Sequence, residues 1–404
     1  MKPLITIISE CHSDNLGDQA IARSLSNILH PFYSVTETSF GCLTISQTDN
    51  SALPTKLRKS ILRKVFSTVP AKTRMRIWWH ILGKKRKFAK HFGASIKESD
   101  LVVVGGGQLI KNNLALFSEK LSLISDISNS YSTPFGLLGV GVDKKMDSQN
   151  WRIVKKAINK AKFITLRDFT SRDRLDTAVN LERDFSILPD LAFALKNPEF
   201  SQEMSDRSVS LAINIMDFDA MLSGLGYVKK PDANIFVEGL CDIVKIAHNN
   251  GSTIKLFTSG TPEDLIAANN VKTKISMRTG VDVPIFHPST LSHLLNFLVD
   301  VDDVIATRMH AGILSYISGC NPLCVNWDDK VAGVWSTINQ PERVVSVEDI
   351  ANKNASEIIL RGLQNLAPAS QHSLDELAEK ISLCVLEPIR KTLVHDQASV
   401  TLKT

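Results

Sequence analysis

The stretch VIATRMHAGILSYISGCNPLCV, residues 304–325, indicates the fold class of this chain most directly. It opens with a β-branched apolar run and passes through a short polar turn into an apolar segment. That segment stops at Gly319, and a second apolar run follows from Asn321. The order of strand, turn, helix, glycine stop and strand is typical of an α/β fold with parallel strands.

The same alternation extends along most of the chain. Strands are predicted at Leu4–Ile8, Leu101–Val104, Phe135–Gly139, Phe163–Leu166, Val209–Ile213, Thr253–Phe257 and Val304–Ala306, and helices at Gln19–Leu29, Trp151–Ala161, Ile235–Asn249 and Leu291–Leu298. Apolar strands that are each followed by a helix indicate parallel sheets covered on both faces.

A polar segment at 196–208 divides this pattern, and after about residue 346 the pattern is wholly helical. We therefore predict two doubly wound, Rossmann-like α/β domains, 1–200 and 205–346, that face a cleft. A helical tail, 347–404, would follow and could cross back onto the first domain. Ligands are expected in the cleft, at the carboxyl ends of the strands.

The composition is that of a soluble globular protein, with 404 residues of which 43% are hydrophobic and 22% charged. No run of about eighteen apolar residues is present that could span a bilayer. The N-terminal stretch MKPLITIISECHSDN is broken by Glu10 and His12 and does not resemble a secretory signal, so we expect a cytoplasmic protein. The six cysteines are scattered without zinc-site spacing, which argues against a structural metal site.

Residues 51–97 carry fourteen Lys and Arg residues and no Asp or Glu, whereas the rest of the chain is net acidic. The basic side chains alternate with apolar ones and with the pair Trp78-Trp79. Amphipathic helices of this kind bind anionic membrane surfaces, so we expect the segment to hold the protein reversibly at the inner face of the cytoplasmic membrane. The other interpretation is a solvated helical insertion. Nucleic-acid binding is not expected, because no recognised motif accompanies the patch.

The motif NLGDQA lies between the first predicted strand and the first predicted helix. Gly17 permits a tight turn, and the free N–H groups of the new helix can hold an anion. Asn15 or Asp18 can instead cap that helix. On spacing alone, the cap is the favoured interpretation.

Three consecutive glycines, Gly105, Gly106 and Gly107, follow the predicted strand LVVV. They let a substrate or a neighbouring loop approach the backbone closely. The pattern is not GxGxxG, and no acidic residue lies at the ribose-binding offset, so a dinucleotide site is poorly supported.

Cationic residues follow several predicted strands. Arg167 comes just after one, although its neighbour Asp168 also fits a structural ion pair. Arg308 and His310 stand between the carboxyl end of a strand and the amino end of a helix. An Arg fork and helix N–H groups both suit carboxylates and phosphates. Lys330 follows the last predicted strand and could reach the same pocket.

Together these motifs resemble the polysaccharide pyruvyl transferases. The resemblance is carried, in family order, by NLGDQA, GGGQLI, GVGV, LRDFTS, PDLAF and TRMHAGILSYISGCNPLCVNWDDKV, over about residues 15–335. It implies a GT-B-like fold with phosphoenolpyruvate bound between the domains and a saccharide acceptor. Arg308 and His310 match the Arg-x-His of the family donor site, Arg167 a further donor-binding Arg, and Lys330 a family lysine. Residues 51–97 lie outside the resemblance.

The implied reaction moves the pyruvyl group onto sugar hydroxyls as a ketal, for an exopolysaccharide, capsule or cell-wall glycan. It requires no metal or organic cofactor. A His can act as acid and base in such steps, which favours His310 as the catalytic residue. The acceptor could be lipid-linked, which would suit a membrane-bound enzyme. Two other interpretations are a GT-B glycosyltransferase with a nucleotide-sugar donor and a non-catalytic module that binds glycans or lipid phosphates.

Overall fold

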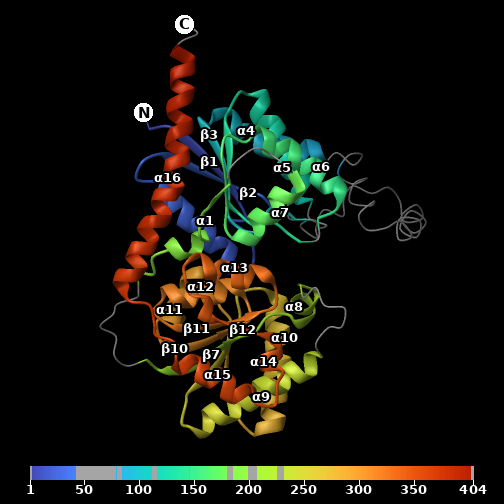
Figure 1. Ribbon diagram of the computed structural model, residues 1–404, viewed down its shortest axis with the longest axis vertical. Coiled ribbons are helices and arrows are strands. Elements are labelled where there is room, and N and C mark those ends of the chain that lie inside the picture. Colours follow the sequence, from blue (N-terminus) through green and yellow to red (C-terminus); the bar gives the residue numbers. More distant parts are fainter. Residues whose placement is uncertain are drawn as a thin grey trace, which may run out of the picture.

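The computed structural model describes residues 2–41, 79, 84–111, 116–144, 146–179, 185–198, 207–224 and 232–401. Within these residues the chain forms two parallel six-stranded sheets, each flanked by helices, which follow one another along the long axis of the molecule (Figure 1). This architecture confirms the predicted fold class. The domain limits 1–200, 205–346 and 347–404 stay a prediction, and most of the polar segment between the sheets lies outside the described residues.

The first sheet has the order β2-β1-β3-β4-β5-β6. Its strands are β1 Leu4–Ser9, β2 Ser34–Ser39, β3 Leu101–Gly105, β4 Phe135–Val140, β5 Ile164–Leu166 and β6 Ser186–Ile187. The helices that accompany it are α1 Leu16–Leu29, α4 Lys84–Glu98, α5 Phe117–Ser130, α6 Ser148–Lys160 and α7 Phe169–Val179. Strand β3 is buried along its whole length, because helices cover both faces of the sheet.

The second sheet has the order β12-β11-β10-β7-β8-β9. Its strands are β7 Val209–Asn214, β8 Ile254–Phe257, β9 Ile285–Phe286, β10 Val301–Ala306, β11 Asn321–Asn326 and β12 Val344–Ser346. Its helices are α8 Phe218–Gly224, α9 Ala233–Asn249, α10 Pro262–Thr279, α11 Leu291–Leu298, α12 Met309–Ile317, α13 Asp329–Thr337, α14 Val347–Ile350 and α15 Ala355–Gln364. In both sheets the strand order reverses beside the first strand, which is where α/β folds bind ligands.

The last helix, α16 Gln371–Thr401, returns to the first half of the molecule (Figure 1). Its apolar face, which includes Ile381 and Ile389, is buried in a core shared with α1 and with the 3-10 helix η2, Leu191–Ala194. Lys196 and Asp375 add an exposed ion pair of 2.7 Å. The C-terminal helix therefore ties the two halves together.

Part of the basic segment 51–97 is described, namely Trp79 and the helix α4, while 51–78 and 80–83 lie outside the described residues. The Trp79 side chain is only 2% exposed, and its ring centroid lies 5.4 Å from that of Phe88. Phe88, Phe92 and Ile96 form the buried face of α4. This apolar face packs on the first domain and is not available for insertion between lipids. None of the described helices combines the length and the apolar composition needed to cross a bilayer.

Candidate active site

A cavity of about 170 Å³ lies between the two halves, at the carboxyl ends of strands from both sheets. It is lined by Asn15, Asp18, Gln108, Lys111, Arg167, Arg308, Met309, His310, Trp327 and Lys330. Six of these residues are site candidates from the sequence, although they are spread over more than 300 positions of the chain. We call this space the central cavity.

Arg308 is the N-cap of α12 and is held by a buried carboxylate. Its Nε and Nη2 atoms donate to the two carboxylate oxygens of Asp264, at 2.5 and 2.7 Å. Asp264 has no exposed surface and lies in the first turn of α10. The Arg308 backbone N–H donates to Asn214 at the end of β7. The guanidinium is thereby fixed in orientation, and within the described residues its Nη1 makes no hydrogen bond.

His310, one residue into α12, shares a second buried carboxylate with Arg167. The nearest oxygen of Asp190, Oδ2, lies 3.5 Å from His310 Nε2 and 3.5 Å from Arg167 Nη1. Burial alone would raise the pKa of Asp190, but its contact with His310 and the charges of His310 and Arg167 outweigh this effect and lower it. Asp190 is therefore an anion at neutral pH, placed to orient the imidazole.

Arg167 combines the two interpretations left open by the sequence. It lines the central cavity, and its Nε lies 3.4 Å from Asp168 in a fully buried ion pair. Asp168 also accepts hydrogen bonds from the backbone and hydroxyl of Ser171 at the start of α7. Gly141 leaves room for this guanidinium, since an added Cβ would approach Arg167 Nε to 2.7 Å.

Asn15 caps α1 by accepting a hydrogen bond from the backbone N–H of Gly17, and it donates to Asp18. Asn15 and Asp18 also line the central cavity, so the helix cap forms part of the cavity wall. Gly17 does not line it. A Cβ at Gly17 would lie 2.3 Å from the Cβ of His310, so this glycine makes room for the imidazole.

The three glycines at the end of β3 and just after it shape the fold and do not line the central cavity themselves. A Cβ at Gly105 would meet Leu25, and one at Gly106 would meet Ile21, both on α1. Gly106 and Gly107 have φ values of +72° and +73°, the left-handed region that favours glycine. The glycine run therefore lets α1 approach the sheet and turns the chain toward Gln108 and Lys111.

Two buried lysines complete the cavity. Lys330 Nζ lies 3.3 Å from the Gln108 side-chain oxygen and 4.4 Å from the centre of the Trp327 ring. Burial lowers the pKa of Lys330 to about 8; Asp328 opposes the shift, and the positive charges of Arg167 and Lys111 add to it. Burial also lowers the pKa of Lys111. Lysines with pKa values this far from the ordinary value cluster at functional sites.

A further ionisable pair lies next to the cavity. Burial raises the pKa of Glu10, and the negative charge of Asp18 adds to the shift. Burial lowers the pKa of Lys120 to about 8, and its ammonium sits 4.8 to 5.6 Å from three Phe rings. The Lys111 ammonium is 4.0 Å from one of these rings, that of Phe117. The charged array thus extends from the central cavity into the first domain.

Sequence reasoning missed Gln108, Lys111, Met309 and Trp327 in the cavity wall and the supporting carboxylates Asp190 and Asp264. The PDLAF motif contains Asp190 and was a signal for it. The central cavity surrounds one His with two Arg and two Lys residues, an arrangement suited to a small polyanion. Among the described residues, no cluster of three or more His, Cys, Asp or Glu could hold a metal ion.

Comparison with known proteins matches the chain to a family. The family model for polysaccharide pyruvyl transferase matches residues 15–329, a range that runs from Asn15 in the wall of the central cavity almost to Lys330. The chain belongs to the polysaccharide pyruvyl transferase family. It is therefore a member of a transferase family, and the matched range contains the motifs that carry the resemblance in the sequence, except the last two residues of the final motif, Lys330 and Val331.

Solved structures similar to this pyruvyl transferase family member show the fold. UDP-GlcNAc 2-epimerase from Neisseria meningitidis, bound to UDP-GlcNAc, has a TM-score of 0.52 at 9% identity, with 97% of this chain and all of that one covered. Anabaena Alr3699/HepE in complex with UDP-glucose has a TM-score of 0.55 at 10% identity, over 98% and 100% of the two chains. Trehalose 6-phosphate synthase from Burkholderia multivorans gives 0.52 at 10% identity over both full chains. These likenesses confirm the two-domain, GT-B-like fold class. No curated protein sequence matches the chain.

Proposed function

We propose that this member of the pyruvyl transferase family transfers the pyruvyl group of phosphoenolpyruvate to two hydroxyls of a saccharide, as a ketal. The observation that carries the proposal is the ring of Arg167, Arg308, Lys111 and Lys330 around His310 in the central cavity. Phosphoenolpyruvate carries a carboxylate and a phosphate, and its binding needs several cations in a small space. A cavity of about 170 Å³ suits this donor, since sites for larger ligands span about 300–1,000 Å³.

In the proposed chemistry, His310 carries out the proton transfers. Its imidazolium gives a proton to the methylene carbon, and positive charge develops at the adjacent carbon that bears the phosphate. A sugar hydroxyl forms a C–O bond there and returns a proton to the His. The C–O bond to phosphate then breaks, and a second hydroxyl closes the ketal. Of the two hydroxyl protons, one ends in the new methyl group and the other on the released phosphate.

The supporting carboxylates have separate positioning roles in this scheme. Asp190 would orient the imidazole and stabilise its protonated form, because it is buried, anionic and 3.5 Å from Nε2. Asp264 would keep the Arg308 fork rigid for the donor, since it already holds two of its nitrogens. The fixed geometry lowers the entropic cost of binding a charged donor.

A nucleotide-sugar donor is the alternative that the fold suggests, since two of the similar structures hold UDP-sugars. In the sequence, the stretch FTSGTPEDL, residues 257–265, could form a nucleotide pocket, although it carries no clear signature of one. In the structure this stretch supplies Thr261 and Asp264 to Arg308. These side chains are thus already engaged at the central cavity, which favours the small anionic donor.

The decisive experiment is an assay of inorganic phosphate released from phosphoenolpyruvate. It is run with and without a glycan acceptor isolated from the cells in which this protein is made. Phosphate is expected only with acceptor, in equal amount to the ketal formed. His310→Gln is expected to retain donor binding and lose about 10²–10⁴-fold in rate, the usual contribution of general acid catalysis. Near-normal rates in His310→Gln would contradict the catalytic role of this residue. Transfer of a sugar from a UDP-sugar would contradict phosphoenolpyruvate as the donor.

We also propose that the exposed basic face of α4, with Lys85, Arg86, Lys87 and Lys90, attaches the enzyme to anionic lipids, where a lipid-linked acceptor would be available. Because the apolar face of α4 is buried, the attachment would be electrostatic and salt-sensitive. Sedimentation with anionic vesicles at low salt is expected to carry the protein down, and neutralising these four residues to release it. Equal sedimentation of the neutralised variant would contradict this attachment.

A further inference from the structure

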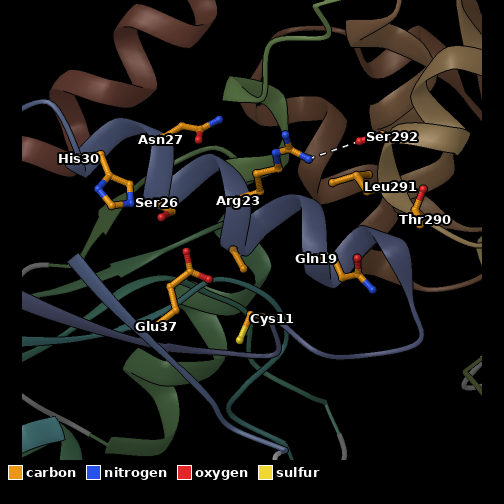
Figure 2. Close-up of a pocket in the computed structure, with 11 residues that line it drawn as sticks. Cys11, Gln19, Arg23, Ser26, Asn27, His30, Glu37, Thr290, Leu291 and Ser292 are labelled. Atoms are coloured by element: carbon orange, nitrogen blue, oxygen red, sulfur yellow. Dashed lines mark hydrogen bonds between the residues drawn. The ribbon is translucent and has the colours of Figure 1, made fainter.

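A second cavity lies along α1, beyond the first turn of that helix, and the start of α11 closes one side of it (Figure 2). Its volume is about 400 Å³, within the range of about 300–1,000 Å³ of small-ligand sites. The first half contributes a stripe of α1 that starts at Gln19, together with Glu37 of β2. The second half contributes Thr290, Leu291 and Ser292. We call this cavity the α1 groove.

The lining of the α1 groove consists mainly of hydrogen-bonding groups. Gln19 and Asn27 offer amides, Ser26 a hydroxyl and His30 an imidazole, and Arg23 and Glu37 bring opposite charges. Among the residues that the structure describes, no Phe, Tyr or Trp lines the groove for a nucleotide base to stack on, and the cations of the groove do not cluster as a diphosphate would require. A polyhydroxylated, uncharged ligand matches this lining best.

Four of the polar side chains that line the groove have unused hydrogen-bonding capacity. The side chains of Ser26, Asn27, His30 and Glu37 make no hydrogen bond or ion pair within the part of the chain that the structure describes. Ser26, Asn27 and His30 are spaced on α1 so that they share one face, and Glu37 comes from β2. The weak contact from Arg23 to Ser292, at 3.5 Å, joins the two walls.

Helix α1 places the groove next to the central cavity. Asp18 lines the cavity, and the next residue, Gln19, lines the groove. The start of the helix is fixed against the second half, because the Leu16 backbone N–H donates to Ser259 and Gly17 packs on His310. Along α1, the groove therefore begins at the residue after the last one that lines the central cavity, and a chain of sugars could occupy both sites.

We propose that the α1 groove binds the part of a saccharide acceptor that is not pyruvylated. The proposal rests on the proposed function and extends it by giving the enzyme a preference for oligosaccharides. Sugar units in the groove add hydrogen bonds that a single sugar in the central cavity cannot make. Residues of α1 and α11, away from the reacting atoms, would thus make the affinity depend on the length of the acceptor.

The test uses a panel of immobilised neutral monosaccharides and oligosaccharides, with Asn27→Trp as the variant. Asn27 is exposed, so the indole fills the groove without disturbing the core. The wild type should retain oligosaccharides more strongly than the matching monosaccharides. Asn27→Trp should weaken oligosaccharide retention about tenfold through lost hydrogen bonds, with unchanged affinity for phosphoenolpyruvate. Asn270→Trp, at an exposed position of α10 that lines neither cavity, is the matched control and should behave as the wild type.

Three results would overturn the groove assignment: no length-dependent retention by the wild type, equal retention by Asn27→Trp, or displacement of the saccharide by UDP. A wild type that retains oligosaccharides and does not bind phosphoenolpyruvate would contradict the proposed function and leave the groove as a saccharide site. The two failures are therefore distinguishable.

Discussion

At the scale of single residues, the site keeps ionised groups where burial disfavours them. Lys330 and Lys120 have pKa values lowered to about 8, and the Lys330 ammonium has a neutral amide and an aromatic ring as its close partners. A lysine whose pKa is lowered on folding destabilises the folded state fully below its folded pKa. The penalty disappears as the pH rises toward the unfolded value of about 10.4. An anionic ligand that binds the charged ammonium would offset this penalty.

The Lys330→Met variant tests this reasoning. At pH 7 it should raise the melting temperature, since the buried charge is removed, while weakening phosphoenolpyruvate binding. Wild-type affinity should fall as the pH rises through about 8, because the anion binds the protonated lysine, and Lys330→Met should show a flatter profile. Calorimetric titrations at pH 7, 8 and 9 measure the affinity profiles of the two proteins, and thermal unfolding at pH 7 measures their melting temperatures. Parallel profiles for the two proteins would contradict a direct contact between Lys330 and the donor.

The sequence did not allow the partners of the site residues to be predicted. Arg308 and His310 could be found because a strand end and a helix start flank them in the chain. Their carboxylates, Asp264 and Asp190, are distant in sequence: Asp264 meets Arg308 within the second half, and Asp190 meets His310 only where the two halves come together. Lys111 gave no signal of its own, because its depressed pKa arises from burial in the folded protein.

At the scale of elements, the site is built from two helix starts that meet. Helix α1 brings its N-cap Asn15 and helix α12 its N-cap Arg308 to the same cavity. Gly17 permits the meeting, because any side chain there would enter the space of His310. The positive ends of both helices face the cavity, which favours an anionic ligand.

Gly17→Ala should therefore lower the turnover of pyruvyl transfer strongly while the protein stays folded. The added Cβ would lie 2.3 Å from His310 Cβ, so the imidazole must move away from Asp190. Gly93→Ala is the matched control, because nothing lies within 4 Å of its added Cβ and it is also helical. Phosphate release at saturating donor, with circular dichroism for folding, is the measurement. Equal turnover in both variants would contradict the proposed packing role of Gly17.

Elements with a strong apolar pattern were predictable from the sequence, and the others were not. Helix α11 was predicted with its observed limits, Leu291–Leu298. The edge strand β2, SVTETS, has few buried positions and so no apolar run to reveal it. The amphipathic pattern of α4 was visible, but the sequence could not show that its apolar face packs against the core of the first domain.

At the scale of the whole molecule, the two halves are joined through the site itself. His310 contacts Asp190, Lys330 contacts Gln108, and Arg174 pairs with Asp329 at 3.0 Å, each across the boundary between the halves. Helix α16 also packs its apolar face against the first half. The fold class followed from the repeated strand–helix pattern, whereas the close approach of the two sheets depends on contacts that no local pattern encodes.

The central claim is that the cavity between the halves binds phosphoenolpyruvate, and donor binding can be measured without knowing the acceptor. Isothermal titration of the wild-type protein with phosphoenolpyruvate, UDP-GlcNAc and UDP-glucose in turn is the most direct test. We predict saturable binding of phosphoenolpyruvate that Arg308→Ala weakens by about 2 kcal/mol or more, as expected when a buried charged contact is lost, and no binding of either UDP-sugar. Saturable binding of a UDP-sugar, with phosphoenolpyruvate inert, would contradict the account.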